Sequence, residues 1–226
     1  MELNNFQLFL SQSGLFFEGV AAIIALLYYK SVNRQYWKYF AYYLVIIFLC
    51  EILGKWGVNW ITFSEPGIEK IKKAIYYNYF VIPLQFIFFY WLYGAKSLKN
   101  NRIFWIFSLL YVLSFIPSEL YFKESKIVSS FNYTFGCLLL MIMVILEYYK
   151  QINSEDIISF HKNRMFYINL GVTLFYIGTL PFFTFYELLY KESPEIWSIY
   201  YSYYQISLLL MYLLFSISFI WGKQNS

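Results

Sequence analysis

Long apolar runs with very few charged residues are the feature that most constrains this chain. The sequence is 60% hydrophobic and only 13% charged over its 226 residues. Soluble domains carry roughly twice that charged fraction. A run of about 20 apolar residues is what one helix needs to cross the hydrocarbon core of a bilayer. The runs therefore predict an all-α, polytopic integral membrane protein.

Seven runs, separated by short polar segments, are candidate membrane spans. They cover residues 6–29, 37–60, 74–93, 103–116, 128–149, 165–189 and 197–221. The fourth run is the weakest because Pro117 follows it, although it could extend through Tyr121. Because the connections are too short to hold a soluble domain, we expect one seven-helix transmembrane domain over residues 1–226.

The charged residues in the connections predict the orientation of the bundle. Lys and Arg dominate the connections after the first, third and fifth spans, whereas Lys and Glu are mixed on the other side. Because cytoplasmic loops carry the excess of Lys and Arg, we expect the N-terminus outside and the C-terminus in the cytoplasm. The frequent Lys, Asn, Ile, Tyr and Phe are typical of an AT-rich bacterial gene, so the expected location is the bacterial cytoplasmic (inner) membrane.

The second run carries Glu51 and Lys55 among Leu, Ile and Phe residues. The acid precedes the base by four positions, which is the favoured order for a helical ion pair, and Asn59 adds a polar group on nearly the same face. Ionisable groups are costly in hydrocarbon, so such a pair indicates a functional site by default. A purely structural ion pair between helices is an equally good interpretation.

Glu18 is another acid inside an apolar run. It lies near the middle of the first span and shares a helical face with Gly14, Ala21, Ala22 and Ala25. Small residues let helices approach closely, so we expect this face to point into the bundle. Glu18 is then either a buried proton or cation site, or a carboxyl group satisfied by a neighbouring hydroxyl.

Further polar residues share the depth of Glu51 and Lys55, near the midplane or in the outer half of the membrane. They are Asn78 and Gln85 in the third span, Asn132 in the fifth, Glu187 in the sixth, and Tyr204 and Gln205 in the seventh. With Glu51, Lys55 and Asn59 they predict a polar, aromatic-walled cavity that opens to the outside and binds a ligand. For most of the tyrosines in this region, an ordinary interfacial aromatic belt is the competing interpretation.

The residues that cofactor sites need are scarce. His161 is the only histidine, and Cys50 and Cys137 lie inside apolar runs, where cysteine usually packs as a small hydrophobe. We therefore expect no metal or other cofactor, and no nucleic-acid partner. Enzyme activity is disfavoured because phosphate-binding and hydrolase motifs are absent, although acids and tyrosines could perform acid–base chemistry at a membrane.

Three spans carry a resemblance to a known class of proteins. Their segments are CEILGKWGVNW at Cys50–Trp60, NYFVIPLQFIFFYWLY at Asn78–Tyr93 and FYINLGVTLFYIGTL at Phe166–Leu180. The pattern resembles the seven-helix membrane modules of bacterial sensors, in which the bundle usually precedes a histidine-kinase or DNA-binding output domain. Because the sequence ends at Ser226, directly after the seventh span, the resemblance implies output through a separate partner.

Three functions fit these observations. The leading hypothesis is a receptor-like or sensory protein that binds a small or lipid-like ligand in the outer-half cavity and acts through a protein partner at its cytoplasmic face. The second is a small transporter or channel that uses Glu18 and Glu51 as proton or cation sites, and Pro83 and Pro181 fit the broken helices of transporters. The third is a membrane effector or pore accessory that works as a homo-oligomer.

Overall fold

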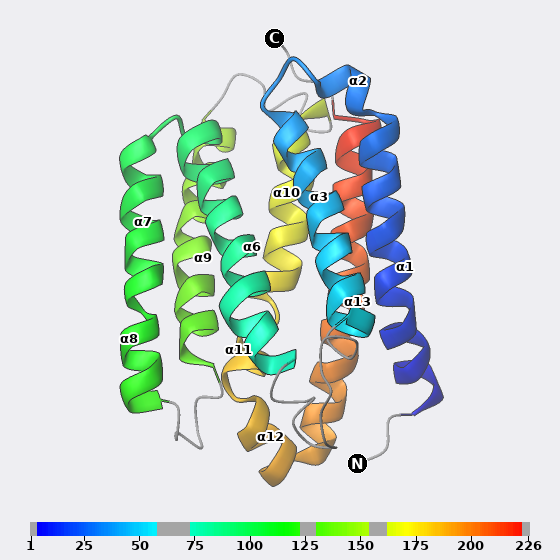
Figure 1. Cartoon of the computed structure of the whole chain (residues 1–226), viewed down its shortest axis with the longest axis vertical. Coiled ribbons are helices and arrows are strands. Elements are labelled where there is room, and N and C mark those ends of the chain that lie inside the picture. Colours follow the sequence, from blue (N-terminus) through cyan, green and yellow to red (C-terminus); the bar gives the residue numbers. More distant parts are fainter. Residues whose placement is uncertain (1–3, 58–72, 123–129, 154–161, 223–226) are drawn as a thin grey trace.

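The computed structural model describes residues 4–57, 73–122, 130–153 and 162–222. Within these ranges the chain forms helices and turns and contains no strand. The helices run side by side as a bundle, and α1 (Asn5–Leu27) begins at the end opposite to that where α13 (Pro194–Ile220) finishes (Figure 1). We call the end where α1 begins the N-end of the bundle, and the other the C-end.

Seven stretches within the described residues are long and apolar enough to cross a membrane. They are Asn5–Leu27, Trp37–Gly57, Lys73–Ser97, Asn101–Phe122, Phe131–Ile152, Arg164–Thr184 and Pro194–Ile220. The prediction of an all-helical chain with seven helices of spanning length is confirmed.

Several stretches change helical type along their length, and π-helical segments are labelled η. After α1 the chain forms α2 (Tyr29–Val32), α3 (Trp37–Ile52), η1 (Leu53–Gly57), η2 (Tyr77–Val81), α6 (Ile82–Tyr90) and η3 (Trp91–Ser97). It continues with α7 (Asn101–Leu113), α8 (Phe115–Pro117), η4 (Ser118–Phe122), α9 (Phe131–Ile152), α10 (Arg164–Val172), η6 (Thr173–Ile177), α11 (Leu180–Thr184) and α12 (Tyr186–Glu192) before α13.

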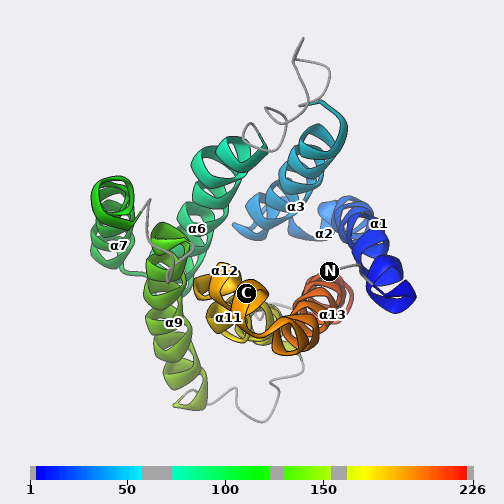
Figure 2. The same ribbon diagram turned by 90° about the horizontal axis from the view of Figure 1, so that it is seen from below.

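Contacts between the helices define their arrangement in the bundle. α1 packs against α3 and α13 (Figure 2). α13 packs in turn against α10. α9 contacts both α6 and η6. α7 lies at the edge of the bundle in both views, next to η3 and α9, and its span has the smallest buried share of the seven, 17%. Most of the surface of α7 is therefore left to face lipid.

Hydrogen bonds of the Asn4 and Gln7 side chains fix the start of α1. The Gln7 amide donates to Asn4 Oδ1 at 2.8 Å and the Asn4 amide donates to Gln7 Oε1, which forms a capping box. Gln7 Nε2 also donates to the hydroxyls of Ser198 and Ser202 at 2.8 and 3.1 Å. One glutamine therefore both caps α1 and fixes it to α13.

The small-residue face of α1 points into the bundle, as predicted. Its buried members include Gly14, Glu18, Ala21, Ala22 and Ala25. Next to them, a Cβ atom on Gly19 would lie 3.0 Å from the Phe48 ring of α3. Small side chains thus allow α1 and α3 to approach closely, which is the usual basis of helix packing in membranes.

The fourth span is longer than its uninterrupted apolar run. It continues through Pro117 to Phe122. The apolar pattern had predicted an end at Ile116 or an extension through Tyr121. Proline removes one backbone donor but is tolerated in membrane helices where neighbouring groups satisfy the backbone. Here the Ser118 amide donates to the Ser114 carbonyl at 3.2 Å, so the helix continues past the proline.

The sixth span is interrupted, whereas its apolar pattern predicted continuity to Leu189. η6 is followed by a turn at Gly178 and Thr179, by α11 and, after Phe185, by the separate helix α12. Pro181 cannot donate to the helical ladder, which favours a break in this region. The Thr179 hydroxyl meanwhile donates to a carbonyl of the preceding turn.

Candidate functional site

A cavity of about 600 Å³ lies inside the bundle, toward its N-end. Residues of α1, α3, η1, η2, α6, α9, η6, α11 and α13 line it, so π-helical segments of three spans contribute to its wall. The volume is within the roughly 300–1,000 Å³ of small-molecule sites. Its polar lining, besides the residues predicted from the sequence, includes Ser11, Lys73, Tyr77, Ser130, Tyr176 and Tyr212.

The structure brings most of the predicted site residues together in this cavity. Those that line it are Glu18, Glu51, Lys55, Asn78, Gln85, Tyr204 and Gln205. Asn132 and Glu187 line a smaller neighbouring pocket of about 210 Å³, to which Asn78 also contributes. Asn59 lies outside the described residues. Polar residues of the first, second, third and seventh spans, which the sequence predicted to lie at similar depth, therefore line the same cavity.

Glu51 and Lys55 do not form the helical ion pair that their spacing predicted. Within the described part of the chain, Glu51 is bonded instead to Tyr77, whose hydroxyl donates to Glu51 Oε2 at 2.8 Å. Lys55 is exposed, and its Nζ lies 5.5 Å from the centroid of the Trp56 ring. The prediction assumed α-helical spacing, but η1 begins at Leu53, between the two residues, and a π-helical turn alters their angular offset.

Gly54 allows Tyr77 to reach Glu51. A Cβ atom at Gly54 would lie only 2.3 Å from the Tyr77 hydroxyl oxygen, closer than any real contact. Tyr77 comes from η2, so the hydrogen bond joins the second and third spans across the wall of the cavity. A side chain at position 54 would displace the tyrosine and leave Glu51 without this donor.

Glu18, on α1, is only 4% exposed. The Tyr212 hydroxyl of α13 donates a hydrogen bond to Glu18 Oε1 at 2.5 Å. The interpretation of Glu18 as a carboxyl group bonded to a neighbouring hydroxyl therefore agrees with its geometry. Gln85 is bonded in the same manner, since the Tyr176 hydroxyl donates to Gln85 Oε1 at 3.0 Å. Tyrosine hydroxyls thus hold three of the predicted polar groups in place.

Gln205 is different because its amide has no partner among the described residues. The residue is 6% exposed, lines the cavity, and makes no hydrogen bond to any residue that the structure describes. Gln205 therefore offers a donor and an acceptor to whatever occupies the cavity, whether water or a ligand.

Aromatic side chains fill the bundle between the cavity and the C-end. Phe40 of α3 packs edge-on against Phe215 at 5.2 Å between ring centroids and stacks on Phe219 at 5.6 Å. Phe89 of α6 packs edge-on against Tyr176, which itself lines the cavity. Of these residues only Tyr176 lines the cavity, and the phenylalanine rings pack behind it as an aromatic floor toward the C-end.

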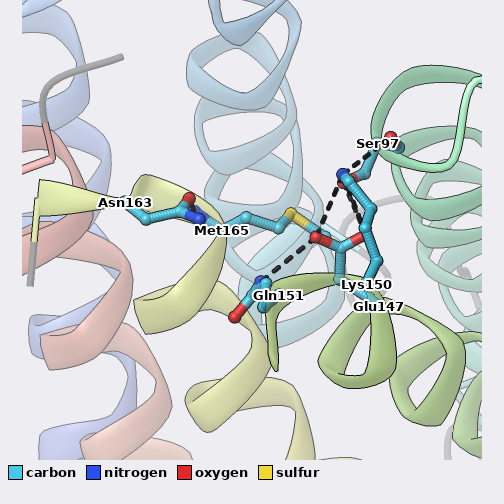
Figure 3. Close-up of polar contacts among 6 residues, drawn as sticks. All are labelled: Ser97, Glu147, Lys150, Gln151, Asn163 and Met165. Carbon is cyan, nitrogen blue, oxygen red and sulfur yellow. Dashed lines mark hydrogen bonds and ion pairs between the residues drawn. The ribbon is translucent and has the colours of Figure 1, made fainter. Parts of the chain in front are cut away.

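A second polar cluster surrounds Glu147 at the C-end of the bundle (Figure 3). It was not predicted from the sequence, because Glu147 resembles an ordinary acid at the end of a helix. Glu147 is 1% exposed, less than either acid of the cavity. Ser97 Oγ donates to Glu147 Oε2 at 2.6 Å, Lys150 Nζ donates to the Ser97 carbonyl at 2.9 Å, and Gln151 Nε2 donates to Glu147 Oε1 at 3.1 Å. The only signal in the sequence is the spacing of Glu147, Lys150 and Gln151, which places them on one face of α9.

Arg164 was also missed, because the apolar pattern places it in a loop. It is 7% exposed, and its Nε donates to the Gly222 carbonyl at 2.7 Å. Its guanidinium also lies 5.7 Å from the Phe219 ring centroid. Arg164 thus fixes the start of α10 to the end of α13, at the C-end of the bundle, which is a structural role.

Comparisons with models of known protein families, with curated proteins and with solved structures find no match for this chain. The resemblance to the seven-helix modules of bacterial sensors therefore stays a prediction, and the site carries the functional argument by its own geometry.

Proposed function

We propose that this chain is a receptor-like multi-pass membrane protein that binds a small or lipid-like ligand in the N-end cavity. The observation that carries the proposal is the cavity itself, which gathers two acids and several amides from different spans. The unpartnered amide of Gln205 within it favours an occupant that donates and accepts hydrogen bonds. Pockets with mostly apolar walls and a few convergent polar groups are the usual form of small-molecule sites.

The aromatic floor between the cavity and the C-end favours a receptor over a conduit. A ligand held above Phe40, Phe215 and Phe219 would change the packing of α3 and α13 without passing through the bundle. Both helices reach the C-end, so their displacement offers a route for a signal. In this proposal the N-end faces the outside of a bacterial inner membrane and the basic C-end meets a separate protein partner, as the distribution of Lys and Arg favours.

Analysis of co-purifying molecules tests ligand binding. Protein extracted from its native membrane and examined by mass spectrometry should retain a molecule that a Glu51→Gln, Gln205→Leu double variant loses. Glu192→Gln, which changes an exposed acid of α12, is the matched control and should retain the molecule. Equal retention by the wild type and the double variant, or no retained molecule in any sample, would overturn the proposal.

A transporter or channel is the second candidate, and one observation favours it. Glu18 and Glu51 line one cavity, next to interrupted helices of the second, third and sixth spans, as in transporters that carry protons or cations. Transport would require the aromatic floor to open. Proton or sodium flux into vesicles that contain the reconstituted protein, abolished by Glu18→Gln, would favour this function, whereas absence of flux would favour the receptor.

A further inference from the structure

An open groove on the outside of the bundle is separate from the cavity. It runs between α3 and the α6–η3 helix, has a volume of about 490 Å³, and shares no lining residue with the cavity. Its walls are almost entirely apolar or aromatic, with Ile46 and Leu84 nearest the middle of the bundle. The Tyr43 ring stacks on the Phe88 ring at 4.0 Å and forms the base of the groove.

Positive charge is concentrated at one end of this groove. Lys96 lines the groove near the C-end, and its Nζ lies 5.1 Å from the centroid of the Trp91 ring. Lys38, at the start of α3, lies over the ring of Tyr39, which also lines the groove. Neither lysine has an ion pair with an acid among the described residues. Both ammonium groups therefore have free donors for an anion at this end.

The length of the groove matches one leaflet of a bilayer. From Leu84 to Lys96 a helix rises by at most about 18 Å, at roughly 1.5 Å per residue. The hydrocarbon of one leaflet is about 15 Å thick. A molecule in the groove would therefore have its anionic part at the membrane surface beside the lysines and its apolar part along Phe88 and Ile46, toward the midplane.

We propose that this groove binds one anionic phospholipid, with the phosphate at Lys96 and Lys38 and an acyl chain over Tyr43, Phe88 and Ile46. The apolar walls alone would accept any lipid, but the two unpaired lysines distinguish anionic headgroups from neutral ones. Basic pockets between membrane helices bind anionic headgroups on this principle. The hydroxyl of Tyr42, bonded to that of Tyr29 beside the groove, adds a further polar contact at headgroup depth.

Native mass spectrometry of the full chain in detergent tests the proposal. The protein is mixed with phosphatidylglycerol and phosphatidylcholine of identical acyl chains. We expect one phosphatidylglycerol molecule to be retained in preference, and the preference to fall by about fivefold when either lysine is replaced by glutamine in Lys96→Gln or Lys38→Gln. Ile46→Trp should lower retention of phosphatidylglycerol without any change in charge, because it fills the acyl end of the groove.

The Lys99→Gln, Arg102→Gln double variant is the matched control. Both residues are exposed cations at the same end of the bundle and do not line the groove. Equal retention of the two lipids by the wild type, or an equal loss of preference in the control, would show that no built site exists. Displacement of the lipid by inorganic phosphate at millimolar concentration would also overturn the proposal, because the acyl chain should dominate binding. Unchanged thermal unfolding of the Lys96→Gln protein will show that it is folded.

Discussion

At the scale of single residues, tyrosine hydroxyls bond three of the polar groups that line the cavity. Tyr212 bonds Glu18, Tyr77 bonds Glu51, and Tyr176 bonds Gln85. Each tyrosine belongs to a different helix from its partner, so each bond both satisfies a polar group in hydrocarbon and joins two spans. The abundance of tyrosine in this chain is thus more than an interfacial belt, although exposed members such as Tyr121 fit that interpretation.

Removal of the Tyr212 hydroxyl should destabilise the protein. Tyr212→Phe keeps the ring but leaves the buried Glu18 carboxyl without its donor, so the free energy of unfolding should fall by about 1–3 kcal/mol. The measurement is denaturant or thermal unfolding in detergent. Tyr121→Phe, at a ring that is 77% exposed, should have little effect. Similar losses in both variants would contradict a specific role for the bond to Glu18.

The cluster at the C-end permits a second test of the same type. Ser97→Ala removes one of the donors to Glu147, a residue that is 1% exposed, and should also lower the free energy of unfolding by about 1–3 kcal/mol. Ser31→Ala is the control, because the exposed Ser31 hydroxyl bonds only the backbone of its own turn. Thermal unfolding of both variants gives the comparison, and an unaffected Ser97→Ala protein would argue that Lys150 and Gln151 suffice.

At the scale of elements, the π-helical segments distinguish this bundle from one built of seven regular α-helices. η1, η2 and η6 all contribute residues to the cavity wall. π-helical turns are rare and occur frequently at functional sites. In the second span the segment also separates Glu51 from Lys55, so that the acid bonds Tyr77 and the base lies over Trp56.

A pair of glycines within η1 tests the role of this segment. Gly54→Ala would place a Cβ atom 2.3 Å from the Tyr77 hydroxyl, so it should displace Tyr77 and reduce stability by about 1–3 kcal/mol. Gly57→Ala meets only the flexible end of Leu53 at 3.1 Å and should be tolerated better. Unfolding measurements on both proteins provide the test. A tolerated Gly54→Ala would mean that Tyr77 has another position available.

At the scale of the whole molecule, the exterior is apolar as expected of a protein surrounded by lipid. Large side chains face outward from several helices, including Phe16 at 68%, Trp105 at 67% and Ile199 at 71% exposure. Many exposed apolar side chains on spans of this length are compatible with a lipid bilayer. Buried polar groups instead lie in the cavity, in the cluster around Glu147 and at contacts between helices such as that of Gln7 with α13.

Cysteine labelling tests the orientation that we propose. The native Cys50 and Cys137 are buried, so they should react slowly with a membrane-impermeant maleimide. In intact cells, Glu192→Cys at the N-end should be labelled, whereas Asn100→Cys at the C-end should be labelled only after the membrane is permeabilised. The reverse pattern would place the cavity on the cytoplasmic side and would contradict an extracellular ligand.

The sequence by itself determined the number of long helices, because this follows from hydropathy along each span. It also grouped seven polar residues that line the cavity, since residues at similar depth that face the bundle interior can meet, but it did not predict most of the lining. The partners of Glu51, Glu18 and Glu147 were decided only by the tertiary structure. Glu18 and Tyr212 are 194 positions apart, and the rotation of each helix depends on π-helical turns and on packing against its neighbours. Local periodicity, which assumed a regular α-helix, therefore predicted an ion pair where the fold makes a hydrogen bond between helices.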